Sequence, residues 1–174
     1  MQARKQHAPG PAPHFGRKEV LSESASSGLA FSAARVLNGM VGQAKSCFDA
    51  GLDPDYVFGE FDIEKLKTYI GLEPNLASEL LYLYKDRKGD ERFSACVLVA
   101  TAIFFTSIAE PDLARGIVAR IVRKARKDES FTYMAKITLI SVAELSRNTA
   151  EEAGCKDEEF MRLGERCMGI FAKL

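Results

Sequence analysis

The sequence has few of the residues on which most catalytic sites depend. It contains no tryptophan and two histidines, and both histidines, His7 and His14, lie in a proline-rich N-terminal stretch. General acid–base catalysis at neutral pH most often uses histidine, so Ser-His-Asp and Cys-His nucleophile arrangements are missing from the rest of the chain. We therefore expect a protein that is not an enzyme; the alternative is an enzyme with a carboxylate- or tyrosine-based mechanism.

Signatures of cofactors and metals are also missing. The chain has no Gly-rich phosphate loop, dinucleotide fingerprint, H-E-x-x-H zinc motif or calcium loop. Its four cysteines form no C-x-x-C pair and have no histidine at zinc-ligand spacing. We expect no cofactor and no metal. Cys47, Cys96 and Cys167 fall on expected apolar helix faces as buried free thiols, whereas Cys155 lies in a polar loop.

Long hydrophobic runs are absent as well. The longest, residues 93–109, is interrupted by Ser and Thr and falls short of the roughly 20 apolar residues that a bilayer span needs. No apolar core follows the basic residues near the N-terminus, as a secretory signal requires. With free thiols, these features predict an intracellular protein of a reducing compartment, the cytoplasm, without membrane contact.

The charge balance is even, with 24 Lys and Arg against 24 Asp and Glu. This excludes a uniformly basic nucleic-acid coat and an acidic tail protein. Any electrostatic partner must be recognised through local segregation of charge.

Two regions differ in composition. Residues 1–27 hold three of the six prolines, a run of serines and the cations Arg4, Lys5, Arg17 and Lys18, which predicts a flexible basic tail. Residues 28–174 show helical periodicity throughout and no sustained alternation of period two. We predict a single all-α domain, a compact bundle of seven or eight helices.

Capping signals and periodicity give the helices. Gly51 and Gly71 each precede an acid and a proline that start a new helix, and residues 149–152 fit a capping box. Gly39 and Gly42 lie inside the first helix, where glycine is unfavourable. Three explanations are open: a close approach of another helix, an oligomer contact, or a local break between two shorter helices. The expected helices are 27–50 with Ser27 as N-cap, a short one from Pro54, 62–70, 74–88 ended by Gly89, 91–108, 111–127, 130–148 and 157–173. Residues 91–108 are apolar almost all round, which predicts the central helix.

The strongest local feature is the helix expected over residues 111–127. Its cations fall within one half of the helical wheel and its apolar residues occupy the other half. Phosphate backbones favour such a stripe through counterion release. Complementing the helix dipole explains the cations of residues 123–127 but not Arg115 and Arg120; a merely solvated face is the other interpretation. The candidate nucleic-acid-binding residues are Arg115, Arg120, Arg123, Lys124, Arg126 and Lys127.

Residues 46–64 carry the opposite charge, with six acids and no Lys or Arg. This acidic stretch could meet the basic stripe of a neighbouring copy, giving head-to-tail association, or meet it within one molecule. The aromatic residues Tyr82, Tyr84, Phe104 and Phe105 could serve as base-stacking platforms, but helical periodicity favours core packing.

These patterns support two hypotheses of different classes. The first is a self-associating helical protein that binds nucleic-acid phosphates, RNA among them, through the basic stripe, in a packaging or regulatory role. The rival is a protein–protein adaptor, chaperone or inhibitor whose charged faces dock a protein partner.

Overall fold

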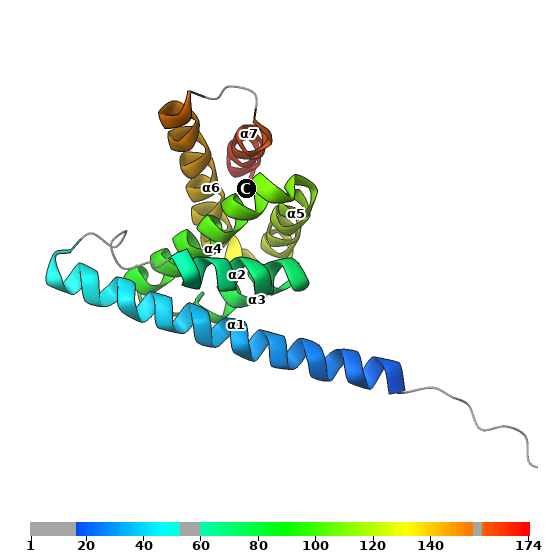
Figure 1. Ribbon diagram of the computed structural model, residues 1–174. Coiled ribbons are helices and arrows are strands. Elements are labelled where there is room, and N and C mark those ends of the chain that lie inside the picture. Colours follow the sequence, from blue (N-terminus) through cyan, green and yellow to red (C-terminus); the bar gives the residue numbers. More distant parts are fainter. Residues whose placement is uncertain (1–16, 53–59, 155–157) are drawn as a thin grey trace, which may run out of the picture.

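The computed structural model describes the backbone of residues 17–52, 60–154 and 158–174, and the side chains from residue 27 onward except at 53–61 and 155–157. The described part is all-α, as predicted, with seven α-helices and one 3-10 helix (Figure 1). The expected helix from Pro54 lies outside the described residues. The elements are α1 (Arg17–Ala50), α2 (Glu60–Leu72), α3 (Leu76–Leu83), α4 (Gly89–Ala109), α5 (Pro111–Lys127), η2 (Glu129–Phe131), α6 (Thr132–Ala153) and α7 (Glu159–Phe171).

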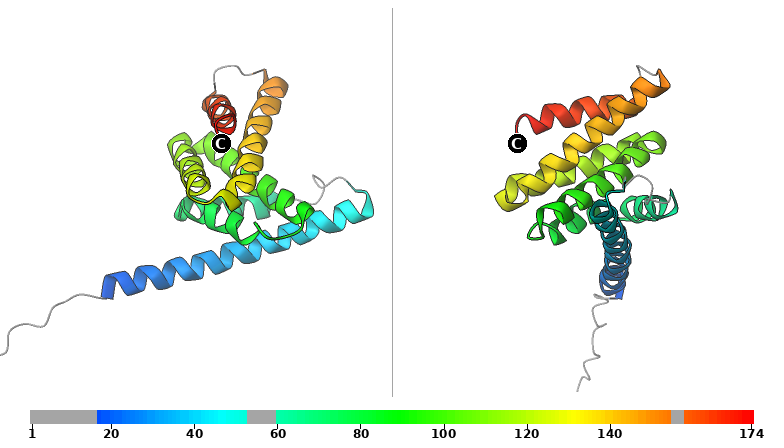
Figure 2. Two further views of the ribbon diagram at one scale, coloured as in Figure 1. Left: turned by 180° about the vertical axis from the view of Figure 1, so that it is seen from behind. Right: turned by 90° about the vertical axis from the view of Figure 1, so that its left-hand side faces the viewer.

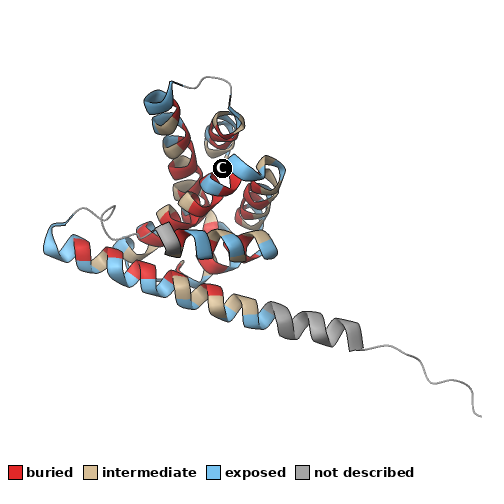
Figure 3. Cartoon of the chain, viewed as in Figure 1, coloured by how far each residue is buried: buried red, intermediate tan, exposed pale blue. Residues whose placement is uncertain are grey.

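Helix α4 is the central element, as its apolar sequence predicts. It contacts every other α-helix: α1, α2 and α3 lie on one side, and α5, α6 and α7 on the other (Figures 1 and 2). Most of its residues are buried, among them Cys96, Leu98, Val99 and Ile103 (Figure 3). The helix is long and apolar enough to cross a membrane by composition, a property it shares with core helices that neighbouring helices enclose.

Helix α1 is longer than predicted. It begins at Arg17, ten residues before the expected N-cap at Ser27, so the predicted flexible tail over residues 1–27 overlaps it, and residues 1–16 lie outside the description. The last proline of the N-terminal cluster is Pro13, and nothing after it prevents a helix. The N-terminal part of α1 extends past the other helices (Figure 2).

The glycines of α1 do not interrupt it. The helix is continuous through Gly39 and Gly42, which corrects the expectation of a local break. Both glycines are exposed, and a Cβ at either would meet no atom within 4 Å. No close approach of another described helix therefore accounts for them.

Helix ends were predicted unevenly. As predicted, Pro111 begins α5, and Gly51, with φ of 66°, follows α1. In contrast, α2 continues through Gly71 to Leu72 and α3 begins at Leu76, not at Pro74. Helix α6 runs past the expected end at residue 148, and Gly154 follows it, also with φ of 66°. Gly89, expected to end a helix of residues 74–88, instead begins α4, and α3 already ends at Leu83. Residues 149–152 are no capping box, because α6 continues through them to Ala153.

Three cysteines are buried free thiols, as predicted. Cys47, Cys96 and Cys167 are at most 6% exposed. Burial raises the pKa of the Cys96 and Cys167 thiols to about 12. Cys155 lies outside the described residues.

Candidate nucleic-acid interface

Helix α5 has a strictly divided surface. Pro111 sits at its start, where a missing N–H costs no hydrogen bond, and basic side chains occupy its last turn, where they complement the negative end of the helix dipole. Six of its apolar side chains are buried, whereas Leu113 is half-buried and Ala119 is exposed; the buried ones are Ala114, Ile117, Val118, Ile121, Val122 and Ala125. The six predicted cations lie on the opposite half, but the structure gives them three different environments.

Arg115 is neutralised by carboxylates. Its guanidinium donates to Asp112 Oδ1 at 2.6 Å and to Glu159 Oε2 at 2.8 Å. These two hydrogen bonds raise the pKa of Arg115 further above its ordinary value. Asp112 lies one turn earlier on α5 and Glu159 begins α7, so Arg115 ties the two helices together. We therefore remove it from the predicted binding set.

Lys124 lies over an aromatic ring. Its ammonium is 4.1 Å from the ring centroid of Tyr82 and 5.8 Å from that of Phe131. A second ammonium, from Lys85, is 4.0 Å from the same Tyr82 centroid and donates to the Tyr82 hydroxyl at 2.7 Å. Such contacts stabilise a cation but leave its charge uncompensated by a carboxylate.

Lys85 is the cation that the sequence analysis missed. Besides Tyr82, it contacts Asp128 Oδ2 at 3.9 Å and Ser130 Oγ at 3.4 Å, so it joins the end of α3 to the turn after α5. Asp128 accepts hydrogen bonds from the Ser130 hydroxyl and N–H, which, with the Lys85 charge, lower the pKa of its carboxyl. Only the fold brings Lys85 beside Lys124, because 39 positions separate them in the sequence.

The other four cations form what we call the basic strip: Arg120, Arg123, Arg126 and Lys127. Arg120 is half-buried and the other three are exposed. None of the four makes an ion pair or ring contact with any residue whose side chain is described.

The basic strip is compact and unobstructed. At 100° and 1.5 Å per residue, its side chains span about 120° of arc and about 10 Å along the axis. Ala119 and Gly116 share the arc of the strip but precede it along the helix, and an Arg120 guanidinium nitrogen lies 3.1 Å from where a Gly116 Cβ would stand. Over residues 120–127, the four cations are the only side chains on this arc.

The acidic stretch of residues 46–64 does not neutralise the basic strip within the described part of one molecule. Its one ion pair there joins Glu64 to Lys67, at 2.7 Å. Asp53 and Asp55 lie outside the described residues, as does the side chain of Glu60. Contact with a neighbouring copy stays a prediction.

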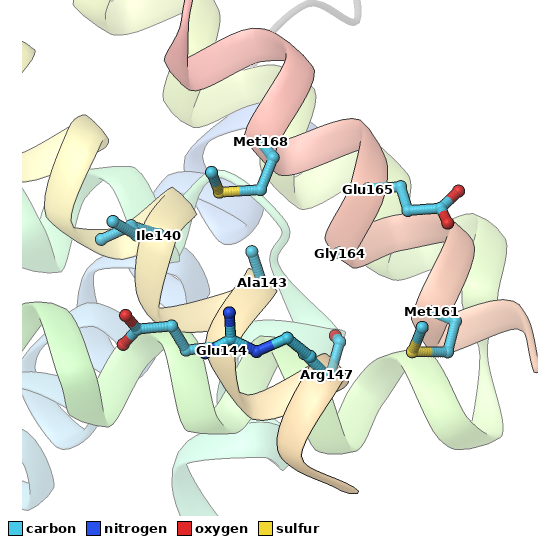
Figure 4. A pocket seen from close by; sticks show the side chains of 9 residues that line it. Ile140, Ala143, Glu144, Arg147, Met161, Gly164, Glu165 and Met168 are labelled. Atoms are coloured by element: carbon cyan, nitrogen blue, oxygen red, sulfur yellow. The ribbon is translucent and has the colours of Figure 1, made fainter. Parts of the chain in front are cut away.

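A second surface feature is a groove between α6 and α7 (Figure 4). Its volume is about 580 Å³, and its walls include Ile140, Met161 and Met168, while Glu144 and Glu165 lie at its rims. Neither glutamate makes an ion pair with a described residue. Arg147 also lines the groove and pairs with Glu151 at 3.9 Å, so the groove is apolar with a charged border (Figure 4).

Two of the four aromatic residues for which core packing was predicted are buried, one is half-buried and one is exposed. Tyr84 and Phe104 are buried, and the Tyr84 hydroxyl donates to the side-chain oxygen of Asn38 on α1. Phe104 packs edge-on against Phe160 and against Phe105, which is 41% exposed. Tyr82 is half-buried under its two ammonium groups.

No metal centre emerges from the described side chains, where no group of three or more His, Cys, Asp or Glu could hold an ion. Comparison with protein-family models, curated proteins and solved structures gives no match. A functional assignment therefore rests on the geometry of this chain.

Proposed function

We propose that this protein is a nonenzymatic, self-associating helical protein that binds nucleic-acid phosphates through the basic strip of α5. The proposal is carried by one observation: four neighbouring cations project from one helix face with no carboxylate partner among the described residues. Arginine forks bind phosphate oxygens bidentately, and unpaired cations bring their full charge to a polyanion.

Counterion release sets the size of the expected effect. Each phosphate contact with a B-form duplex steepens the dependence of log K on log salt by about 0.9, so four contacts contribute about 3.6. The N-terminal cations Arg4, Lys5, Arg17 and Lys18 would add to this slope as auxiliary contacts. The contribution of the strip is therefore best measured as a difference between variants.

The test replaces Arg120, Arg123 and Lys127 with alanine together. Binding to a fluorescent 20-base-pair duplex, measured by anisotropy between 50 and 200 mM KCl, should weaken, and its salt slope should flatten by about 2.7. The matched control replaces Arg35, Arg166 and Lys173, which are exposed and lie on α1, on α7 and at the C-terminus. Equal affinity and slope in the strip variant and the wild type would contradict the proposal.

The groove between α6 and α7 favours a second candidate, a protein–protein adaptor. An apolar groove with methionine walls adapts to different side chains, and the two rim glutamates, which make no ion pair with a described residue, favour a basic partner. On this account one protein co-purifies at near-stoichiometric amounts with or without nuclease. Met168→Glu should abolish that capture, whereas the strip variant should retain it.

A further inference from the structure

We infer that the basic strip binds the phosphate backbone of duplex nucleic acid in preference to single strands. This inference rests on the proposed function and names the class of polymer. Three observations carry it: the state of the Tyr82 ring, the side chains that α5 offers and the spacing of the charges.

The aromatic ring beside the strip is already occupied. Proteins that bind single strands stack successive bases on exposed aromatic side chains within a charged groove. The ring of Tyr82 instead contacts the ammonium groups of Lys85 and Lys124, each about 4 Å from its centroid. The ring centroid of Phe131 lies 6.1 Å from that of Tyr82. Phe131 itself is fully buried. Among the described residues, no aromatic ring contacts Arg123, Arg126 or Lys127.

The face of α5 offers little for reading bases. The strip is the outer side of a helix, and the small residues Ala119 and Gly116 adjoin it on its N-terminal side. The helix contains no Asn or Gln, the side chains that pair bidentately with adenine, so base reading by the strip is confined to guanine, with which Arg and Lys pair. Phosphate contact is the interaction that every position of a mixed-sequence duplex offers to these cations.

The spacing of the charges favours a duplex. A duplex carries one phosphate per about 1.7 Å of axis and each strand one per about 3.4 Å, so about 10 Å of duplex holds roughly six phosphates, three on each strand. Four cations therefore outnumber the phosphates of one strand over this length, whereas the two strands that border a groove together supply enough. With slopes of about 0.9 and 0.7 per contact, the strip contributes about 3.6 on a duplex and about 2.1 on a single strand.

The experiment compares the wild type with a variant in which all four strip residues are alanine. Anisotropy is measured with a mixed-sequence 20-base-pair duplex and with each of its strands, at 50 and 200 mM KCl. From the slopes above, the wild-type-to-variant affinity ratio should fall about 150-fold on the duplex and about 20-fold on a strand over this range. Taking the ratio removes contacts made outside the strip.

A Tyr82→Leu variant tests the stacking alternative. Without a stacking role, its affinity for either strand should stay within about twofold of the wild type, whereas loss of one stacked base weakens binding roughly five- to hundredfold. Circular dichroism first establishes that the Tyr82→Leu variant is helical. If this variant does not fold, the comparison of salt slopes between the wild type and the four-alanine variant decides between duplex and single-strand binding. A single strand that gains as much from the strip as the duplex, or that depends on Tyr82, overturns the inference and leaves the proposed function standing. Equal binding by the wild type and the four-alanine variant overturns both.

Discussion

Six cations on half of one helix differ in how available their charge is. Arg115 is held by two carboxylates and Lys124 lies over a tyrosine ring, whereas the basic strip has no ion-pair or ring partner among the described residues. A charge that is already compensated releases few counterions when a phosphate arrives, because its own carboxylates must first be displaced. The helical wheel therefore overstates the binding surface.

This difference predicts opposite results for two otherwise similar substitutions. Arg123→Gln should flatten the salt slope of duplex binding by about 0.9, the contribution of one phosphate contact. Arg115→Gln should leave the slope unchanged, because Asp112 and Glu159 already hold that guanidinium. Anisotropy titrations at several salt concentrations measure both. A larger change for Arg115→Gln than for Arg123→Gln would refute this division of roles.

The buried thiols give a second prediction at this scale. A pKa near 12 for Cys96 and Cys167 leaves about one thiolate in ten thousand at pH 8, against about one in ten at the ordinary pKa of 9.0. Iodoacetamide at pH 8, followed by mass spectrometry, should modify both only after unfolding in urea. Because the unfolded thiols release their protons first, stability should fall as the pH rises from 9 toward 12. Rapid modification of either thiol in the native protein would show that it is accessible.

At the scale of elements, the residues at a helix N-terminus determine where the helix starts. The contacts between helices depend on segments that are distant in the sequence. Pro111 and the acid after it were sufficient to place α5, since proline fixes φ and lacks only an N–H that has no partner there. Gly89 resembles a terminator in the sequence, yet it starts α4, where Asp90 and Glu91 complement the dipole. Arg115 and Lys85 acquire their partners from α7 and from the turn after α5, and no spacing along the chain encodes such contacts.

The packing of α6 against α7 depends on a glycine. A Cβ on Gly164 would lie 2.7 Å from Ser146 Cβ, and the Ser146 hydroxyl is hydrogen-bonded to Val142 O at 2.8 Å. Gly164→Ala should therefore cost about 1–3 kcal/mol of unfolding free energy through overpacking.

The control for this prediction lies on the same helix. Gly169→Ala meets no atom within 4 Å and should stabilise α7 by up to about 1 kcal/mol, because alanine has the higher helix propensity. Urea unfolding of both variants measures the difference. If the two substitutions have the same effect, α6 and α7 do not approach as closely as described.

For the whole molecule, the sequence predicted the class of the fold and its centre. The apolar surface of residues 91–108 has no polar side to expose, so other helices must surround it, as they surround α4. The start of α1 at Arg17 was missed because this end of the helix extends past the other helices (Figure 1). Without a helix to pack against, the sequence there needs no apolar face, so hydrophobic periodicity does not indicate a helix. The two-sided character of α5 was predicted, but the partners that remove Arg115 from its basic face depend on how distant segments meet.

The formal net charge of the chain is zero, but its positive and negative side chains are unevenly distributed over the helices. The basic strip lies on α5, and the exposed carboxylates of Asp49 and Glu64, the latter paired with Lys67, lie on α1 and α2. Such segregation steers a polyanion toward one face and a second copy toward the same face. Nucleic acid and head-to-tail association should therefore compete for the basic strip.

Lysine acetylation with and without bound nucleic acid tests the central claim most directly, because it locates the contact on the protein. With a saturating 20-base-pair duplex at low salt, Lys127 should be acetylated several times more slowly than in the free protein, while Lys45 and Lys173 should keep their rates. Unchanged acetylation of Lys127, with protection of Lys45 or Lys173 instead, would place the nucleic acid elsewhere and contradict the proposed role of α5.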